Sequence, residues 1–117
     1  MTELVRVNIE RHEHSIVARF QGEVDASNVY SLERDTIAAV PHTCLGLVLE
    51  LSEVDYIDSS GVRMLFTLDH QLRERGQRMR AVVPETTPIK EVLDCLGVGT
   101  VIPLDTELPA ALAQLAQ

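Results

Sequence analysis

Basic residues are scarce in this chain of 117 residues, which has ten Lys and Arg against 18 Asp and Glu and a formal net charge of −8. A surplus of acidic groups repels phosphate backbones and anionic lipid, so it argues against direct binding of nucleic acid or membrane. The same acidity favours a partner with a basic surface. Four arginines do cluster between residues 73 and 80. We interpret them as cations near the carbonyl end of a helix.

The sequence also lacks the features of a membrane or exported protein. No apolar run approaches the roughly 18 residues that are needed to span a bilayer. The N-terminus has neither the basic start nor the apolar stretch of a signal peptide, so we expect a cytoplasmic protein. Hydrophobic residues make up 45% of the chain, which is enough for the core of one domain over residues 1–117.

Cysteine is rare as well, with Cys44 and Cys95 far apart in the chain. No Cys-x-x-Cys spacing indicates redox or zinc chemistry, and the largely apolar neighbours of both residues predict buried free thiols. His12 and His14 are expected on one strand face, but no third ligand accompanies them. We therefore predict neither a metal site nor a cofactor.

The apolar pattern predicts strands that alternate with helices. Alternating residues or short apolar runs indicate five strands, at 4–9, 15–20, 45–51, 79–83 and 101–102. Capping residues, Pro, Gly and helical spacing indicate four helices, from Asp25 to Pro41, from Ser59 to Gly76, from Thr87 to Gly97 and over 106–116. Residues 52–58 are predicted as a polar turn. The order predicts an α/β domain with a mixed, mostly parallel sheet of about five strands and about four helices.

Two polar loops are expected to meet at one end of this sheet. One is Gly22-Glu23-Val24-Asp25, and the other is Asp55-Tyr56-Ile57-Asp58-Ser59-Ser60-Gly61. A right-handed parallel crossover between them brings both loops to the end where α/β proteins bind ligands and partners. Asp58 or Ser59 can cap the helix that follows, and Gly61 allows tight packing in its first turn. The chain contains neither a recognisable catalytic triad nor a phosphate-binding Gly-x-x-x-x-Gly-Lys loop, so we assign no catalytic residue.

These two loops, together with the apolar strand residues 47–51 between them, resemble the STAS domain, the domain of sulfate transporters and anti-sigma factor antagonists. The nearest likeness is to free-standing bacterial anti-sigma factor antagonists, and it covers essentially the whole chain. In that family the anti-sigma factor is a GHKL-type serine kinase that phosphorylates the serine directly after the aspartate. The unphosphorylated antagonist binds this kinase and frees the sigma factor, the phosphorylated form lets go, and a serine phosphatase resets the switch.

The resemblance implies a role for five residues. Ser59 matches the phosphorylated serine, with Ser60 as a second hydroxyl that a kinase could use. Asp25, Asp58, Ser60 and Gly61 are implied in partner binding, and we add Arg63, which departs from the family pattern but lies on the same first turn. Many relatives have a small or aliphatic residue in place of Arg63, which here can face the partner, pair with a nearby acid or contact phosphorylated Ser59. A phosphate on Ser59 adds roughly −1.5 to −2 charges beside Asp25 and Asp58, which disfavours a partner fitted to a neutral hydroxyl.

Two other classes of function stay open. An accessory subunit of a stress-sensing scaffold or a lipid-transport complex would use Ser59 only as a helix cap. Met64 and Phe66 would then form a permanent interface, although core packing is the more ordinary role for them. In an enzyme, Asp25, Asp55 and Asp58 would form an acidic catalytic or metal site, a reading that we disfavour because exposed loop acids are usually solvated caps.

Overall fold

The computed structural model describes residues 5–117, so the first residue of the predicted strand 4–9 lies outside the described part. Its strands are β1 (Val5–His12), β2 (Ser15–Val24), β3 (Gly46–Ile57), β4 (Arg78–Val82) and β5 (Leu104–Asp105). Its helices are α1 (Val29–Ala38), α2 (Ser59–Glu74), α3 (Lys90–Cys95) and α4 (Leu108–Leu115), with a 3₁₀ turn η1 (Val98–Thr100) after α3. The predicted order of elements is confirmed.

The five strands form one sheet in the order β1-β2-β3-β4-β5. β1 and β2 form an antiparallel hairpin, and the other three neighbouring pairs are parallel. The hairpin turns at Glu13, whose φ of 54° is left-handed. The sheet is therefore mixed and mostly parallel, as predicted.

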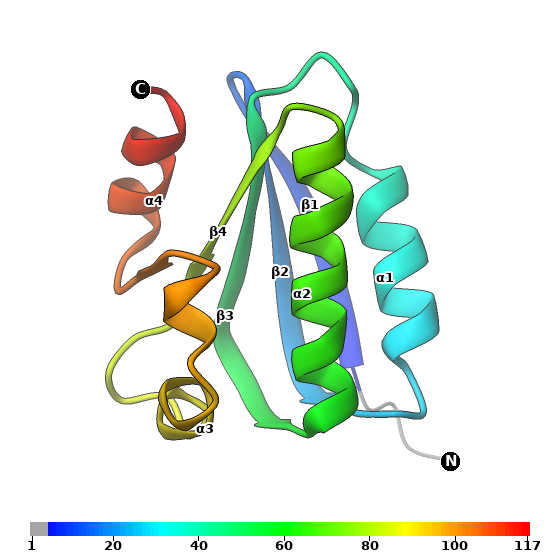
Figure 1. Cartoon of the computed structure of the whole chain (residues 1–117), viewed down its shortest axis with the longest axis vertical. Helices are drawn as coiled ribbons and strands as arrows, with labels where there is room; N and C mark the ends of the chain where they lie inside the picture. Colours follow the sequence, from blue (N-terminus) through cyan, green and yellow to red (C-terminus); the bar gives the residue numbers. More distant parts are fainter. Residues whose placement is uncertain (1–4) are drawn as a thin grey trace.

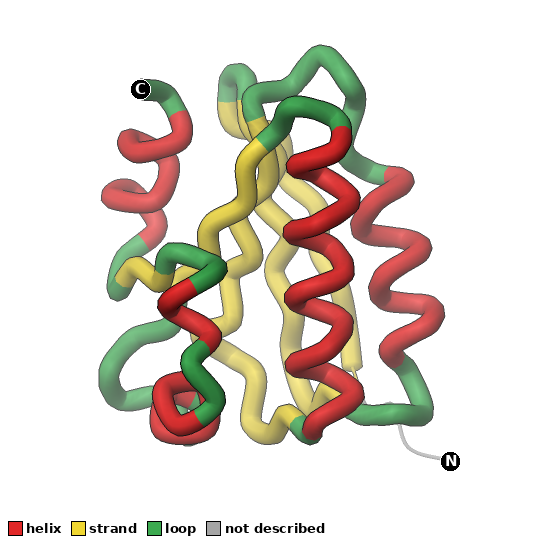
Figure 2. The backbone as a smooth tube through the Cα atoms, in the orientation of Figure 1, coloured by secondary structure: helices red, strands yellow, loops and turns green. Residues whose placement is uncertain are grey.

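Helices cover both faces of the sheet (Figures 1 and 2). Alternate strand residues point to opposite faces. On one face the side chains of Phe20, Leu47 and Leu49 join the main core beneath α1, α2 and α3. On the other face Val17 and Val48 join a smaller apolar cluster beneath α4. No helix in the described part of the chain is long and apolar enough to cross a membrane.

The strand β3 is longer than predicted, because the supposed polar turn 52–58 continues it as far as Ile57. This extension pairs with the end of β2, where Gly22 lies opposite Val54 and Val24 opposite Ile57. Val54 and Ile57 are buried while the residues around them are exposed. Two register shifts in the β2–β3 pairing break the strict alternation of buried and exposed residues. The sequence of this extension was therefore predicted as a turn.

Other boundaries differ as well, since β1 and β2 continue to His12 and Val24 instead of ending at residues 9 and 20. The last strand is β5 rather than 101–102, because Val101 closes the η1 turn and the main chain pairs with β4 only from the Pro103 carbonyl onward. α3 begins at Lys90 instead of Thr87, since residues 85–89 form turns. α4 begins two residues later than predicted, within the usual uncertainty of helix ends.

The cysteine prediction is half right. Cys44 is buried, but Cys95 is exposed. α3 is only six residues long and turns Leu93 into the core, so Cys95 lies on its outer side. The thiol of Cys95 is thus accessible on the surface of the domain.

The arginine cluster does contact carbonyl groups, but mostly those of other elements. Arg78 donates to the carbonyls of Gln114 and Leu115 at the end of α4, at 3.1 and 2.6 Å. Arg75 donates to the Val40 carbonyl, just after α1, at 2.9 Å. These arginines stabilise the ends of neighbouring elements. This structural role explains their clustering, and no nucleic-acid surface is needed to explain it.

Candidate functional site

The two predicted loops are neighbours, at the lower end of the sheet in Figure 1. The ends of β2 and β3 pair through Val24 and Ile57, and the Asp58 amide donates to the Val24 carbonyl at 3.2 Å. α2 starts directly at this point with Ser59. The expected meeting of the two loops is therefore confirmed.

Asp58 connects the two loops through both oxygens of its carboxylate. Oδ1 accepts the backbone amide of Gly61 at 3.0 Å, so Asp58 is the N-cap of α2. Oδ2 accepts the amide of Ala26 at 3.3 Å, which ties the loop before α1 to the start of α2. Of the two residues predicted as possible N-caps, Asp58 is the N-cap, and Ser59 is the first residue of the helix.

The side chain of Ser59 is exposed, whereas that of Ser60 is half-buried. Because Asp58 caps α2, the helix does not depend on the Ser59 hydroxyl. Anionic groups are favoured at a helix N-terminus by the helix dipole and the amides of the first turn. The position can therefore accept negative charge without loss of the helix.

Asp25 is not the N-cap of α1, contrary to the prediction. α1 begins three residues later than a cap at Asp25 would require, after Asn28. Asp25 instead organises the turn before the helix, since its Oδ1 accepts the amide and the hydroxyl of Ser27 at 2.9 and 2.6 Å. A carboxylate that bonds the backbone two residues on is a common turn device, and here it competes with capping.

Asn28 is a structural residue of this site that the sequence reasoning missed. Its Oδ1 accepts the Asp25 amide at 3.1 Å, and its Nδ2 donates to the Glu23 carbonyl at 2.8 Å. The side chain thus joins both sides of the loop that leads to α1. Asparagine shortly after aspartate is a turn signal that could have identified it.

Gly61 is buried where α2 leaves the sheet, and no larger residue fits. A Cβ at this position would lie 2.5 Å from Cγ1 of Ile57 and 3.0 Å from Cγ1 of Val24. The first distance is one that real Cβ atoms essentially never show, and the second is unusually short, so Ile57 would have to shift to make room for a side chain. The predicted tight packing in the first turn of α2 is confirmed.

A groove of about 410 Å³ lies between the neighbouring helices α1 and α2, and Ser60, the residue after Ser59, lines it. Its walls include Val29, Tyr30 and Glu33 from α1, and Ser60, Arg63 and Met64 from α2. Tyr30 is 88% exposed.

Arg63 is exposed, and none of the ion pairs formed within residues 5–117 involves it. Of the three alternatives for Arg63, pairing with a nearby acid is therefore not seen in this part of the chain. Met64 is buried in the core, and Phe66 packs against the core, as the ordinary reading of both residues predicted.

Comparison with known proteins assigns the family. The profile of the STAS domain matches residues 6–111. The chain belongs to the STAS domain family. The likeness expected from the two loops is thereby confirmed, and the site just described lies at the junction of β2, β3 and α2 of a STAS domain.

Individual STAS proteins are similar over nearly the whole chain. BtrV of Bordetella bronchiseptica, assigned as an anti-sigma factor antagonist, is 28% identical over 93% of both chains. An anti-sigma F factor antagonist of Paenibacillus polymyxa is 27% identical over 91% of this chain and 92% of its own. The crystal structure of an anti-sigma factor antagonist from Mycobacterium paratuberculosis superposes with a TM-score of 0.86 at 23% identity, over 97% of this chain and 95% of that one.

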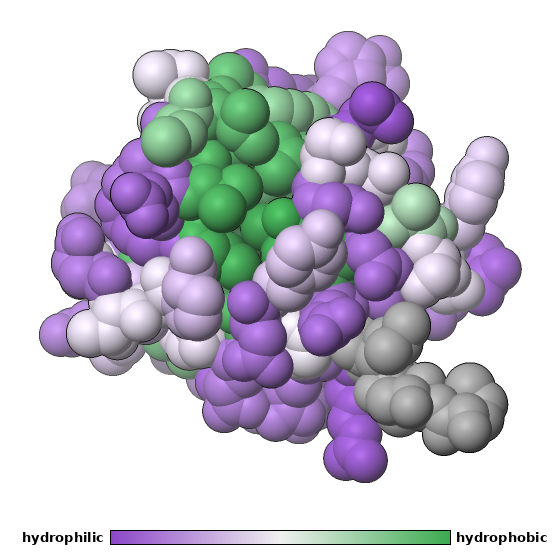
Figure 3. All heavy atoms as spheres, turned by 90° about the horizontal axis from the view of Figure 1, so that it is seen from below, coloured by the Kyte–Doolittle hydropathy of each residue, from purple (hydrophilic) through white to green (hydrophobic). Residues whose placement is uncertain are grey.

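The end of this STAS domain that carries the start of α2 also has an apolar surface. Figure 3 views the molecule from below and shows a continuous hydrophobic area there. α3 lies at the same end in Figure 1, and its outward residues Val92 and Leu96 are 38% and 54% exposed. Apolar areas of this kind, rimmed by polar residues, are typical of interaction surfaces.

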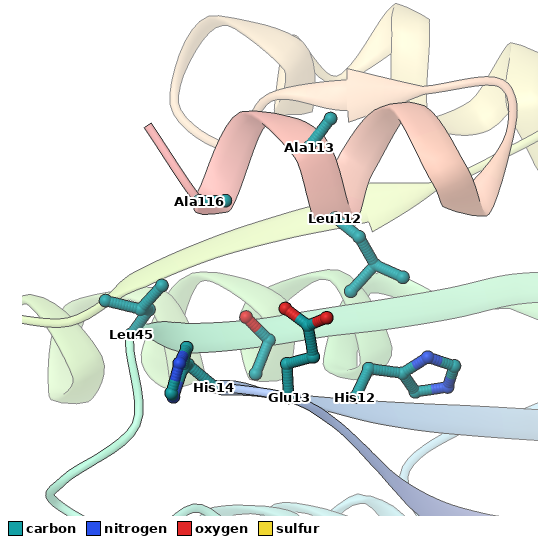
Figure 4. Close-up of a pocket in the computed structure, with 8 residues that line it drawn as sticks. His12, Glu13, His14, Leu45, Leu112, Ala113 and Ala116 are labelled. Atoms are coloured by element: carbon teal, nitrogen blue, oxygen red, sulfur yellow. The ribbon is translucent and has the colours of Figure 1, made fainter.

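A second cavity lies at the opposite end of the STAS domain, between the β1–β2 hairpin and α4. It measures about 350 Å³, and Leu112 of α4 points toward the hairpin residues (Figure 4). His12 and His14 line it but point apart, because His14 lies in the turn rather than on β1. His12 Nε2 contacts Glu10 Oε1 at 3.0 Å. Within residues 5–117 no group of three or more metal-binding side chains occurs.

Proposed function

We propose that this STAS domain is an anti-sigma factor antagonist that binds its partner when Ser59 is unmodified and releases it when Ser59 carries phosphate. The observation that carries the proposal is the exposed Ser59 hydroxyl at the first residue of α2. It lies where the two loops meet, one residue before Ser60 of the groove, at the end of the domain that carries the apolar surface. The names of the two relatives described above support the same function.

Ser59 suits a kinase better than Ser60 does. The Ser59 side chain is exposed, whereas Ser60 is half-buried and lines the groove between the helices. A kinase must reach the hydroxyl and hold it in line with a nucleotide phosphate, which requires an accessible side chain. Phosphate on Ser59 leaves the fold intact in this proposal, because Asp58 holds the start of α2.

The partner that fits this surface is basic and packs closely around an uncharged serine. Glu23 and Asp55 are exposed near Ser59, and Asp25 and Asp58 are partly exposed. A phosphate adds roughly −1.5 to −2 charges to this acidic surface. The phosphate is too bulky for an interface that packs closely around a hydroxyl, and burying its charge where the partner places no cation costs several kcal/mol. We propose that the partner is an anti-sigma factor of the GHKL-type serine kinase class and that a serine phosphatase removes the phosphate.

The acidic residues of the site are structural in this proposal rather than catalytic. Both Asp58 oxygens accept backbone amides, and Asp25 binds Ser27. Gly61 acts through packing against Ile57. The domain is then a substrate and ligand of its kinase, which we expect to act on it in the cytoplasm.

A second candidate is a permanent accessory subunit. The hydrophobic area in Figure 3, with Val92 and Leu96 exposed on α3, favours a stable interface that does not depend on Ser59. In that case the partners would be scaffold or lipid-transport proteins.

The experiment that separates the two is a pull-down from the source bacterium with wild type, Ser59→Glu and Ser31→Glu as baits. Ser31 is an exposed serine of α1, so its variant controls for added charge. Recovery of a GHKL-type ATPase by wild type and by Ser31→Glu, but not by Ser59→Glu, together with phosphate on Ser59 in part of the wild-type bait, would support the switch. Recovery of the same scaffold proteins by all three baits, with Ser59 unmodified, would overturn it.

A further inference from the structure

Arg63 differs from the other arginines of α2 and β4 in what it contacts. Arg73 pairs with Asp69 at 2.9 Å, and Arg80 pairs with Asp105 at 2.7 Å. Arg63 is exposed on the wall of the groove, and no ion pair within residues 5–117 engages its guanidinium. A charged side chain in this situation is available to a group that the unmodified protein does not contain.

The position of Arg63 relative to Ser59 is favourable for such a group. The two residues lie four positions apart on α2, so they are neighbours on one helix face with Cβ atoms about 5–6 Å apart. Long side chains in helices lean toward the N-terminus, which directs Arg63 back toward the turn of Ser59. An anion four residues before a cation is also the more stabilising order of a helical ion pair.

Glu33 is the acidic residue that could compete for Arg63 across the groove. Both side chains line it, yet none of the ion pairs within residues 5–117 joins them. A phosphate carries roughly −1.5 to −2 charges and three acceptor oxygens, against one charge on a carboxylate. A guanidinium can bind two of these oxygens at once, which a lysine cannot do.

We propose that Arg63 binds the phosphate of modified Ser59, an inference that rests on the function proposed above. The Arg63 side chain thereby leaves the groove between α1 and α2. In the unmodified protein Arg63 offers its charge to an acidic side chain of the partner, beside the exposed ring of Tyr30. Phosphorylation then has two effects. It places negative charge at the start of α2, and it withdraws from the groove the cation that the partner binds.

The pairing can be tested by ³¹P NMR on protein with phosphoserine incorporated at position 59 during translation. The second pKa of the phosphate is measured in the wild-type background, in Arg63→Gln, in Arg63→Lys and in Arg34→Gln. Arg34 is an exposed arginine of α1 that pairs with Asp35, and its variant controls for loss of one positive charge.

We expect Arg63→Gln to raise the phosphate pKa by about 0.3 units or more, because the dianion loses its counter-ion. Arg63→Lys should raise it less, and Arg34→Gln should leave it unchanged. The Arg63 Nε–H resonance should also shift on modification of Ser59. Equal phosphate pKa values in wild type and Arg63→Gln, with an unmoved Arg63 resonance, would overturn the proposal.

This test does not depend on a cellular kinase, because the phosphoserine is incorporated directly. Its failure therefore counts against the role of Arg63 alone, while the pull-down above tests the switch at Ser59.

Discussion

Removal of the Asp58 carboxylate should loosen the start of α2 and the loop before α1 together. The carboxylate accepts the amides of Gly61 and Ala26, at 3.0 and 3.3 Å. Loss of an N-cap costs about 0.5–2 kcal/mol, and loss of a further hydrogen bond costs about 0.5–1.5 kcal/mol. Because both bonds end on one carboxylate and the loop can relax, we expect Asp58→Ala to lower the free energy of unfolding by about 1–3 kcal/mol.

Asp58→Asn separates the two contributions. Asparagine caps helices about as well as aspartate, so its Oδ1 can keep the bond to the Gly61 amide. Its Nδ2 is a donor and cannot accept the Ala26 amide. This variant should lose only about 0.5–1.5 kcal/mol and should speed amide hydrogen exchange at Ala26 more than at Gly61.

Urea unfolding and amide exchange measure these effects, with Asp55→Ala as the matched control. Asp55 is an exposed acid near the end of β3, and its removal should change stability by no more than about 0.5 kcal/mol. An Asp58→Ala protein that unfolds at the same urea concentration as the control, with unchanged exchange at Gly61, would refute the double role of the Asp58 carboxylate.

Three further perturbations have expected outcomes. Gly61→Ala should destabilise the domain by about 1–3 kcal/mol in urea unfolding, because the overlap of its Cβ with Ile57 outweighs the helix propensity gained. Burial raises the pKa of the Asp69 carboxyl against the opposing effect of Arg73, so the folded state binds this proton more tightly than the unfolded state does. The free energy of unfolding of wild type, compared with that of Asp69→Asn, should therefore increase as the pH falls through the raised pKa of Asp69. The increase should stop once the pH is below the ordinary pKa range of a carboxyl group. Tyr30→Ala should leave stability within about 0.5 kcal/mol but weaken partner binding at least tenfold in titration calorimetry, as expected for an exposed aromatic at an interface.

Each of these predictions has a control or a contradicting result. Gly99→Ala meets only ordinary van der Waals contacts, so it should cost less than Gly61→Ala, and equal costs would count against the packing argument. An Asp69→Asn protein whose stability follows that of wild type at every pH would contradict the linkage. Undiminished partner binding by Tyr30→Ala would place the interface away from the groove.

The parts of the fold that follow from local chemistry were predictable from sequence. The apolar run 45–51 specified the buried part of β3, and Pro and Gly marked most helix ends. The meeting of the two loops followed from the handedness of a parallel crossover. Gly61 followed from its place in the first turn of α2.

The parts that depend on tertiary pairing were not predictable. β3 continues through residues 52–57 only because β2 extends beside it, and two register shifts hide the alternation of buried and exposed residues. Asp25 could equally cap a helix or bind the turn, and the bonds of Asn28 favour the turn. Cys95 is exposed because α3 ends after six residues, which its apolar neighbours did not indicate.

The most direct test of the switch is the affinity of the recovered ATPase partner for unmodified protein and for protein with phosphoserine at position 59, measured by titration calorimetry at one salt concentration. We predict that the phosphate weakens binding at least a hundredfold, because a bulky anion does not fit an interface that is packed around a neutral hydroxyl. Equal affinities for the two forms, both folded by circular dichroism, would contradict the account.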